Sequence, residues 1–181
     1  MTRPGFSPSP PIEYLTADTA EAELAALSEV LWACVQGGAG IGFVLPFERT
    51  EADAFWRSRL AGLRAGERHL LVARIDGSIA GTVMLELAPQ DNGRHRAEVA
   101  KLMVHPRARR QGLSRRLLAA VEDMALSLGR TLLVLDTVTG DKAEGVYPKA
   151  GYSRVGVIPG YAQAARGGLE ATTVFYKQLE P

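Results

Sequence analysis

Apolar and polar positions alternate along the chain in a way that predicts both helices and strands. Apolar residues recur at helical period in three stretches: from a capping-box spacing at Asp18 and Glu21 to Gly37-Gly38, after a second cap at Thr50 and Asp53, and over residues 112–128. Between the second and third helix, two β-rich runs flank Asp76-Gly77, which predicts a hairpin.

Strands are also expected on both sides of the third helix. Residues 97–106 form a long strand pattern before it, and residues 131–137 lack polar alternation before Asp136, as expected of a strand buried on both faces. This strand–helix–strand order predicts a βαβ unit. Shorter patterns predict strands at 12–15, 153–158 and 171–179 and a short helix at 141–149. The expected fold is α+β (mixed α/β), with a central mixed sheet of six to seven strands flanked by about four helices.

Length and composition indicate one ordinary globular domain. The 181 residues suit a single domain at 12–181, preceded by a Pro-, Ser- and Gly-rich segment, 1–11, that is expected to be a disordered tail. The net charge of +1 argues against a general nucleic-acid binder. No apolar run is long enough for a signal peptide or a membrane span, so a cytoplasmic protein without a membrane partner is expected. Cys34 is the single cysteine, which excludes an intrachain disulfide, and its place on an apolar helical stripe predicts a core residue.

An arginine-rich segment interrupts this near-neutral chain. The stretch VHPRARRQGLSRRLL, residues 104–118, holds five arginines within ten residues and runs from the end of a strand into a helix. The first N–H groups of a helix lack intrahelical partners and attract anions, and the small residues Gly112 and Ser114 leave room for a phosphate. The spacing matches neither the Gly-x-x-x-x-Gly-Lys-Ser/Thr loop nor Gly-x-Gly-x-x-Gly. Nucleotides and coenzyme A both fit this pattern.

The same segment resembles the acyl-CoA-binding motif of the GNAT superfamily of N-acyltransferases, Arg/Gln-x-x-Gly-x-Gly/Ala. Arg109, Gly112 and Ser114 occupy the three fixed positions, with Ser114 departing from Gly/Ala by one hydroxyl. The segment AEGVYPKAGY resembles a second family segment at Ala143, Tyr147, Gly151 and Tyr152, and the resemblance extends over most of the chain. Within the superfamily, the stretches LDT and GVIPGY are similar to the tabtoxin-resistance type, which acetylates the amino-acid-like toxin tabtoxinine-β-lactam.

The resemblance implies a mostly antiparallel GNAT-like sheet, acetyl-CoA as co-substrate and no metal. It also implies direct acetyl transfer to a primary amine of a small molecule, in a ternary complex. A homodimer is common in the family, although no interface is evident from the sequence. The residues implied to hold acetyl-CoA are Leu102, Met103 and Val104 through their backbone, Arg109, Arg110, Gln111, Gly112, Leu113, Ser114 and Arg115 around the helix start, and Ala143 and Tyr147.

Three residues are candidates for the proton transfers that amine acylation requires. Glu98 is the first choice for the base, and Asp136 is the second choice or holds the substrate ammonium group. Tyr147 is the candidate acid, although the following Pro148 disfavours helical geometry at Tyr147. Each has a structural alternative: a charge at a sheet end for Glu98, a turn cap for Asp136 and aromatic packing for Tyr147.

The acceptor side is expected to be formed by the segments 37–47 and 157–168, which carry few charges and many glycines. Phe43 and Tyr161 are the substrate-binding candidates there, together with Glu98 and Asp136. Trp56 and Phe175 are weaker candidates because core packing is the better explanation for each of them. Two other functions compete with catalysis: a non-catalytic acyl-CoA sensor, and a nucleic-acid binder that uses the arginine segment.

Overall fold

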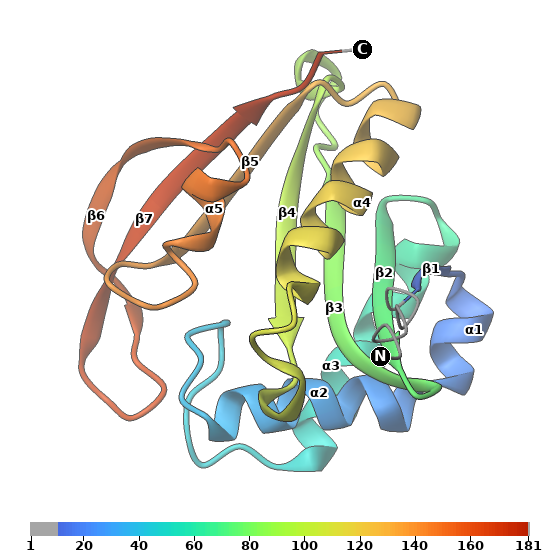
Figure 1. Ribbon diagram of the computed structural model, residues 1–181, viewed down its shortest axis with the longest axis vertical. Helices are drawn as coiled ribbons and strands as arrows, with labels where there is room; N and C mark the ends of the chain where they lie inside the picture. The colour runs from blue at the N-terminus through green and yellow to red at the C-terminus, as the bar shows by residue number, and fades with distance from the viewer. Residues whose placement is uncertain (1–10, 181) are drawn as a thin grey trace, which may run out of the picture.

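A seven-stranded sheet forms the centre of the molecule (Figure 1). The computed structural model describes residues 11–180, so the predicted tail at 1–11 lies outside the described residues except for Pro11. The strand order is β1-β2-β3-β4-β5-β7-β6, and the neighbouring strands are antiparallel except for β4 and β5, which are parallel. The predicted mixed, mostly antiparallel sheet and its βαβ unit are therefore confirmed. The strands are β1 (Ile12–Leu15), β2 (Arg68–Ile75), β3 (Ser78–Leu87), β4 (Arg96–Val104), β5 (Leu132–Val138), β6 (Ser153–Gln163) and β7 (Leu169–Gln178).

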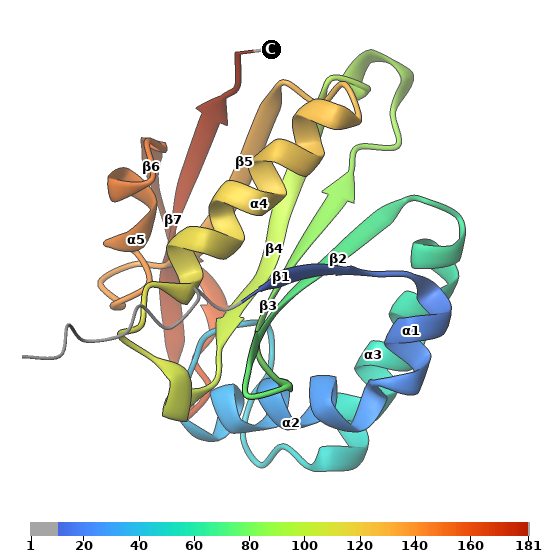
Figure 2. The same ribbon diagram turned by 45° about the vertical axis from the view of Figure 1, so that its right-hand side comes forward.

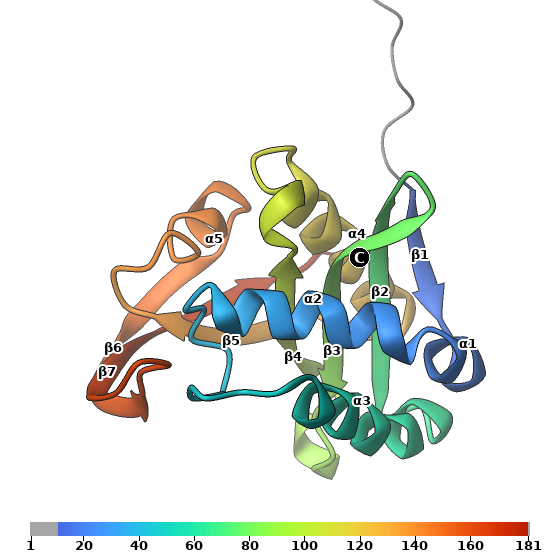
Figure 3. The same ribbon diagram turned by 90° about the horizontal axis from the view of Figure 1, so that it is seen from below.

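Helices cover the two faces of the sheet unequally (Figures 2 and 3). One face packs against α1 (Ala17–Ala22), α2 (Leu24–Gln36) and α3 (Arg49–Arg64), and the sheet residues in that core come from β1 to β4. The other face packs against α4 (Leu113–Ser127) and α5 (Val146–Lys149), and its core reaches across to β5 and β7. No helix within residues 11–180 is long and apolar enough to cross a membrane.

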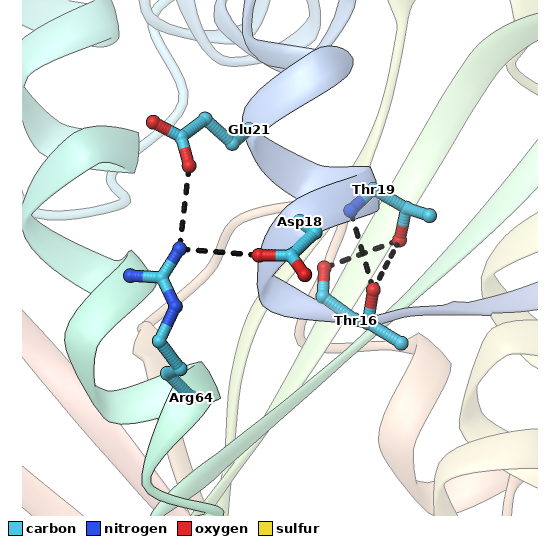
Figure 4. A network of polar contacts seen from close by, with 5 residues as sticks. All are labelled: Thr16, Asp18, Thr19, Glu21 and Arg64. Carbon is cyan, nitrogen blue, oxygen red and sulfur yellow. Dashed lines mark hydrogen bonds and ion pairs between the residues drawn. The ribbon is translucent and has the colours of Figure 1, made fainter.

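The first predicted helix is two helices, and its predicted cap is wrong. Helix α1 begins after Thr16, whose hydroxyl accepts a hydrogen bond from the Thr19 N–H at 3.2 Å, and Glu23 separates α1 from α2. Asp18 and Glu21 both contact Arg64 at the end of α3, at 3.2 and 3.3 Å (Figure 4). The Thr16 hydroxyl satisfies a free N–H at the start of α1. The carboxylates of Asp18 and Glu21, which were predicted to form the cap, connect α1 to α3 on the surface.

The N-terminal cap of α3, the second helix predicted from the sequence, also differs from the prediction. The backbone N–H of Glu48 donates to the Glu51 carboxylate at 2.8 Å, and the two residues form a capping box in place of Thr50 and Asp53. Asp53 pairs with Arg57 one turn later at 2.7 Å. The predicted apolar face is confirmed, because the three residues expected on it are all buried: Trp56, Leu60 and Leu63.

The hairpin and the long helix agree closely with the sequence pattern. Asp76 and Gly77 have φ values of 49° and 79°, the left-handed geometry of a two-residue turn that matches strand twist. Helix α4 begins after Gly112 and ends before Leu128, one residue short of the predicted stretch 112–128 at each end. Its buried stripe contains Leu113, Leu117, Leu118, Val121 and Ala125.

Two expectations near β5 are wrong. Leu133 and Leu135 are buried, but Leu132 and Val134 are only half-buried and Asp136 is exposed, because the helices of the α2 side pack over β1 to β4. The predicted helix at 141–149 is reduced to the single turn of α5. Glycine and proline in this segment disfavour a longer helix.

Gly81→Ala is expected to destabilise the protein by about 1–3 kcal/mol, since overpacking in a well-packed core carries a cost of that size. A Cβ at Gly81 in β3 would lie 2.8 Å from the Met103 backbone oxygen and 3.2 Å from a Leu117 methyl carbon. The matched control is Gly156→Ala in β6, where a Cβ would meet no atom within 4 Å. Urea unfolding of both variants measures the difference. Equal midpoints would contradict close packing between β3 and β4.

Candidate active site

The sheet opens between its two parallel strands. β4 and β5 are in register only at Arg96–Leu132, Ala97–Leu133 and Glu98–Val134. Beyond Glu98 the two strands diverge, which leaves residues 99–104 of β4 without a strand on that side (Figure 1). Backbone N–H and C=O groups in such a gap are available to pair with an extended ligand.

A bulge in β4 lies at this opening. Lys101 has a φ of 50°, and the register with β3 shifts between Thr82 and Met84. The Thr82 hydroxyl donates to the Lys101 carbonyl oxygen at 2.9 Å, which holds the bulge in place. Bulges bend a strand and re-aim its side chains. As a result Lys101 lies on the α2 side of the sheet, where its ammonium group reaches the 37–47 segment.

The start of α4 lies at the same end of β4 and has no side-chain cap. Gly112 precedes the helix with a φ of 74°, and a Cβ there would meet no atom within 4 Å. Arg110, Gln111 and Gly112 are exposed, and Ser114 is half-buried. The first N–H groups of α4 are therefore open to an anion, with the positive end of the helix dipole behind them.

The side chains of this segment differ in how they can contribute. Arg109, Arg110 and Arg115 are all exposed, but the Arg109 guanidinium turns back and donates to the Val104 carbonyl oxygen at 3.4 Å. Leu113 and Met103 are buried in the two cores, which leaves only their backbone for a ligand. Leu102 and Val104 are half-buried on β4.

Tyr147 lies on α5, on the opposite side of the opening from β4. Its ring packs against Tyr152 and Phe175, with centroids 5.9 and 5.6 Å away. Burial, together with the negative charges of Asp136 and Asp141, raises the pKa of Tyr147 to about 12. The hydroxyl is thus protonated throughout the neutral pH range. Ala143 is half-buried in the turn before α5.

Three carboxylates line the α2-side face of the sheet at the opening. Glu86 of β3 and Glu98 of β4 are directly opposite each other, and Asp136 follows on β5 two residues beyond the last registered pair. Asp136 accepts a hydrogen bond from the Thr172 hydroxyl at 2.6 Å. Burial raises the pKa of Glu98, and the negative charges of Glu86 and Asp136 raise it further, while Lys101 opposes them. Like charges on facing strand positions destabilise a sheet, so this carboxylate row is a functional candidate.

Of the four predicted aromatic residues, one lies at the site, two lie in the core, and Tyr161 lies in neither place. Phe43 packs on Phe47 and Phe55 and lies 5.8 Å from the Lys101 ammonium nitrogen, which places it beside the carboxylate row. Tyr161 is 54% exposed on β6, with β7 between it and β5. Trp56 and Phe175 are 1% exposed and belong to the core, as their alternative reading predicted.

Glu86, Lys101 and Arg59 lie at the site but were not predicted from the sequence. Glu86 faces Glu98 through the register of β3 with β4, which no local sequence pattern reports. For Lys101 the signal is a lone lysine within the otherwise apolar run VAKLMV. Arg59 is on α3, and no local pattern connects it to the sheet.

Comparisons with known proteins identify relatives of the chain. Residues 24–152 match the model of the acetyltransferase (GNAT) family. An uncharacterized N-acetyltransferase from the hisH-hisA intergenic region of Azospirillum brasilense is 40% identical over 105 residues, which span 56% of this chain and 60% of that relative.

Solved structures share the fold at lower identity. The ribosomal-protein-alanine N-acetyltransferase of Brucella melitensis superposes with a TM-score of 0.77 at 22% identity, over 93% of this chain and 99% of that one. YncA from Salmonella typhimurium, described as an acetyltransferase and solved with acetyl-CoA, gives 0.76 at 21% identity over 95% of both chains. At this identity the two structures establish the fold.

Proposed function

The chain belongs to the acetyltransferase (GNAT) family, and from this premise we propose that it transfers an acetyl group from acetyl-CoA to a primary amine of a small molecule. The observation that carries this proposal is the divergence of β4 and β5 directly after Glu98. On one side of the opening lies an uncapped helix start, and on the other lies a row of carboxylates. An anionic co-substrate and a cationic acceptor can therefore meet at the same gap.

The residues at the opening fit acetyl-CoA. The unpartnered edge of β4 at residues 99–104 matches the amide-bearing pantetheine arm, which pairs with extended backbone as another strand does. The open cradle at Gly112 and the first N–H groups of α4 match a pyrophosphate. Arg110 and Arg115 add positive charge near this cradle. Acetyl-CoA supplies the thioester carbon that the amine attacks and the thiolate that leaves.

Glu98 is the proposed base. An alkylammonium group must lose a proton before its nitrogen can attack, and a carboxylate whose pKa is raised accepts that proton more readily. Asp136, fixed by Thr172, holds the ammonium group before transfer. Backbone N–H groups of β4 at the opening polarise the thioester carbonyl, in the manner of an oxyanion hole. Tyr147 then donates its phenolic proton to the departing thiolate.

Direct transfer in a ternary complex is favoured over an acetyl-enzyme. Cys34 is 2% exposed, and its thiol donates to the Val104 carbonyl oxygen at 3.5 Å. Burial also raises the pKa of this thiol, which reduces the thiolate fraction needed for nucleophilic attack.

The tabtoxin-resistance type is the finer proposal for the acceptor. It is supported by the LDT segment that contains Asp136 and by GVIPGY in β6. An amino-acid-like toxin or antibiotic such as tabtoxinine-β-lactam is a small amine of the expected kind. Assays with this toxin test the subtype separately from acetyl transfer itself.

Calorimetry and a thiol-release assay test the function. Acetyl-CoA and CoA are expected to bind with micromolar affinity and ATP not to bind, and CoA release is expected to rise with suitable primary amines. Binding of acetyl-CoA without turnover of any amine would favour the sensor. Binding of nucleic acid with steep salt dependence and no affinity for CoA would overturn the proposal.

Tyr147→Phe is expected to lower kcat about 100-fold, the lower range for the loss of a general acid. The change removes the hydroxyl and keeps the ring that packs on Phe175. Tyr152→Phe, in the same aromatic cluster, is the matched control and is expected to leave kcat nearly unchanged. Steady-state kinetics at saturating acetyl-CoA compare the two variants. An equal kcat for Tyr147→Phe and wild type would assign Tyr147 to packing.

A further inference from the structure

Lys101 and Arg59 are two cations beside the carboxylate row that lack carboxylate partners. Among residues 11–180 neither forms an ion pair within 4.0 Å, and the Nε of Arg59 is buried without a hydrogen-bond partner. The Lys101 ammonium group donates to the Ile41 carbonyl oxygen at 3.0 Å, which leaves further N–H donors free.

Aromatic rings bring the two cations to one place. The Arg59 guanidinium carbon lies 4.5 Å from the centroid of the Phe55 ring, and the Lys101 ammonium nitrogen lies 5.5 Å from the same centroid. Phe43 borders Lys101 as well, and its ring meets Phe55 edge-on at 5.3 Å. Burial lowers the pKa of Lys101 and the nearby positive charge of Arg59 lowers it further, while the carboxylates of Glu86, Glu98 and Asp136 oppose this shift.

Two other partly buried cations, Arg74 and Lys177, are paired with carboxylates, whereas Arg116 and Arg130 form no ion pair among residues 11–180. Arg74 binds Glu13 at 2.8 Å and Glu23 at 2.9 Å, and Lys177 binds Glu122 at 2.6 Å. Holding two like charges together in a half-buried position costs free energy when neither forms a direct ion pair, and the more distant carboxylates of Glu86, Glu98 and Asp136 compensate only part of that cost. That cost is offset when a bound anion completes the site, as is common where function requires the charges.

We propose that Lys101 and Arg59 form an anion subsite next to the amine subsite, so that the acceptor is a primary amine that also carries an acidic group. This inference rests on the proposed acetyl transfer. The Lys101 and Glu98 side chains lie on the same face of β4 across the bulge, close enough that each charge shifts the pKa of the other. One small acceptor can therefore present its amine to Glu98 and its acidic group to Lys101. Carboxylates and phosphonates share the required chemistry.

Acceptors in matched acid and neutral pairs test the subsite. Wild-type protein, saturated with acetyl-CoA, is assayed with amino acids against their amides and with 2-aminoethylphosphonate against 3-aminopropanol. The acidic member of a pair is expected to have at least a ten-fold higher kcat/KM, mainly through KM. The amide has the less basic amine, so a preference for the amino acid does not follow from the availability of free amine. The carboxylate and phosphonate pairs tell the two anion classes apart.

Variants connect this preference to the two cations. Lys101→Met and Arg59→Gln are each expected to lower kcat/KM for the acidic acceptor at least ten-fold more than for its neutral partner, whatever common change they cause through Glu98. Arg57→Gln, an exposed arginine on the same helix, is the matched control. Acetyl-CoA affinity by calorimetry verifies that each variant is folded.

The outcomes separate this inference from the function on which it rests. Equal losses for both members of a pair would mean that Lys101 only fixes the loop at Ile41, and they would overturn the subsite. Acetyl transfer without any preference for acidic acceptors would overturn it as well and leave the proposed function intact. Absence of acetyl transfer to all amines would overturn the proposed function and this inference together.

Discussion

Glu98→Gln is expected to lower kcat about 1000-fold, within the range typical of general-base catalysis, and to leave acetyl-CoA affinity unchanged. The amide keeps the size of the side chain but cannot take the proton of the acceptor ammonium group. Stopped-assay kcat values and calorimetric affinities for acetyl-CoA measure the two effects separately. Asp136→Asn distinguishes the alternative base. If Asp136→Asn abolishes turnover and Glu98→Gln retains it, Asp136 is the base and Glu98 holds the ammonium group.

The pH profile gives a second test of the same residue. Because the pKa of Glu98 is raised, its carboxylate is lost at a higher pH than for an exposed glutamate. The rate is therefore expected to fall as pH decreases through this raised pKa, and the residual rate of Glu98→Gln is expected to lack this acidic limb. If the rate of Glu98→Gln still falls at the same acidic pH, the titrating group is a residue other than Glu98.

Gly112→Glu is expected to weaken acetyl-CoA binding more than 100-fold. The cradle at Gly112 is open, so the new carboxylate is accommodated but places a negative charge where the pyrophosphate is expected, next to the start of α4. Charge repulsion at a site that otherwise binds an anion by charge-assisted hydrogen bonds accounts for an effect of this size. Isothermal titration with acetyl-CoA measures the loss directly.

Gly112→Asn is the matched control for this change. Asparagine tolerates the left-handed φ of 74° better than most residues and adds no charge. Its expected loss of affinity is below ten-fold. Equal losses for both variants would indicate that backbone strain, not charge, is responsible, and full affinity in Gly112→Glu would mean that the phosphates bind elsewhere.

Local signals explain which parts of the fold were predictable from the sequence. The Asp76-Gly77 turn and the apolar stripe of α4 depend on residues close in sequence, and both were predicted correctly. The helix caps at Thr16 and Glu48 were missed because several neighbouring polar residues offer similar spacing, and the packing of the chain selects among them. The one-sided burial of β5 depends on where α2 and α3 lie, which no local pattern reports.

The candidate site divides in the same way. The arginine segment and Gly112 were evident because a βα turn and its small residues are contiguous. Glu86 reaches the site through cross-strand register, and Lys101 reaches it through a bulge that reverses the expected alternation. Arg59 enters through packing of α3 over the sheet. Sequence spacing alone does not determine these long-range relations.

The short β4–β5 ladder also has a mechanical consequence. Three registered pairs join the β1–β4 part of the sheet to the β5–β7 part, while β2 and β3 are in register over eight positions. The sheet is therefore most compliant along this line, where the fewest hydrogen bonds resist bending. Helix α4 shares one apolar core with both parts of the sheet, and this packing connects them across the β4–β5 boundary. Small rotations of one part against the other at the β4–β5 boundary can widen or narrow the opening between these two strands while the hydrogen bonds of each ladder stay intact.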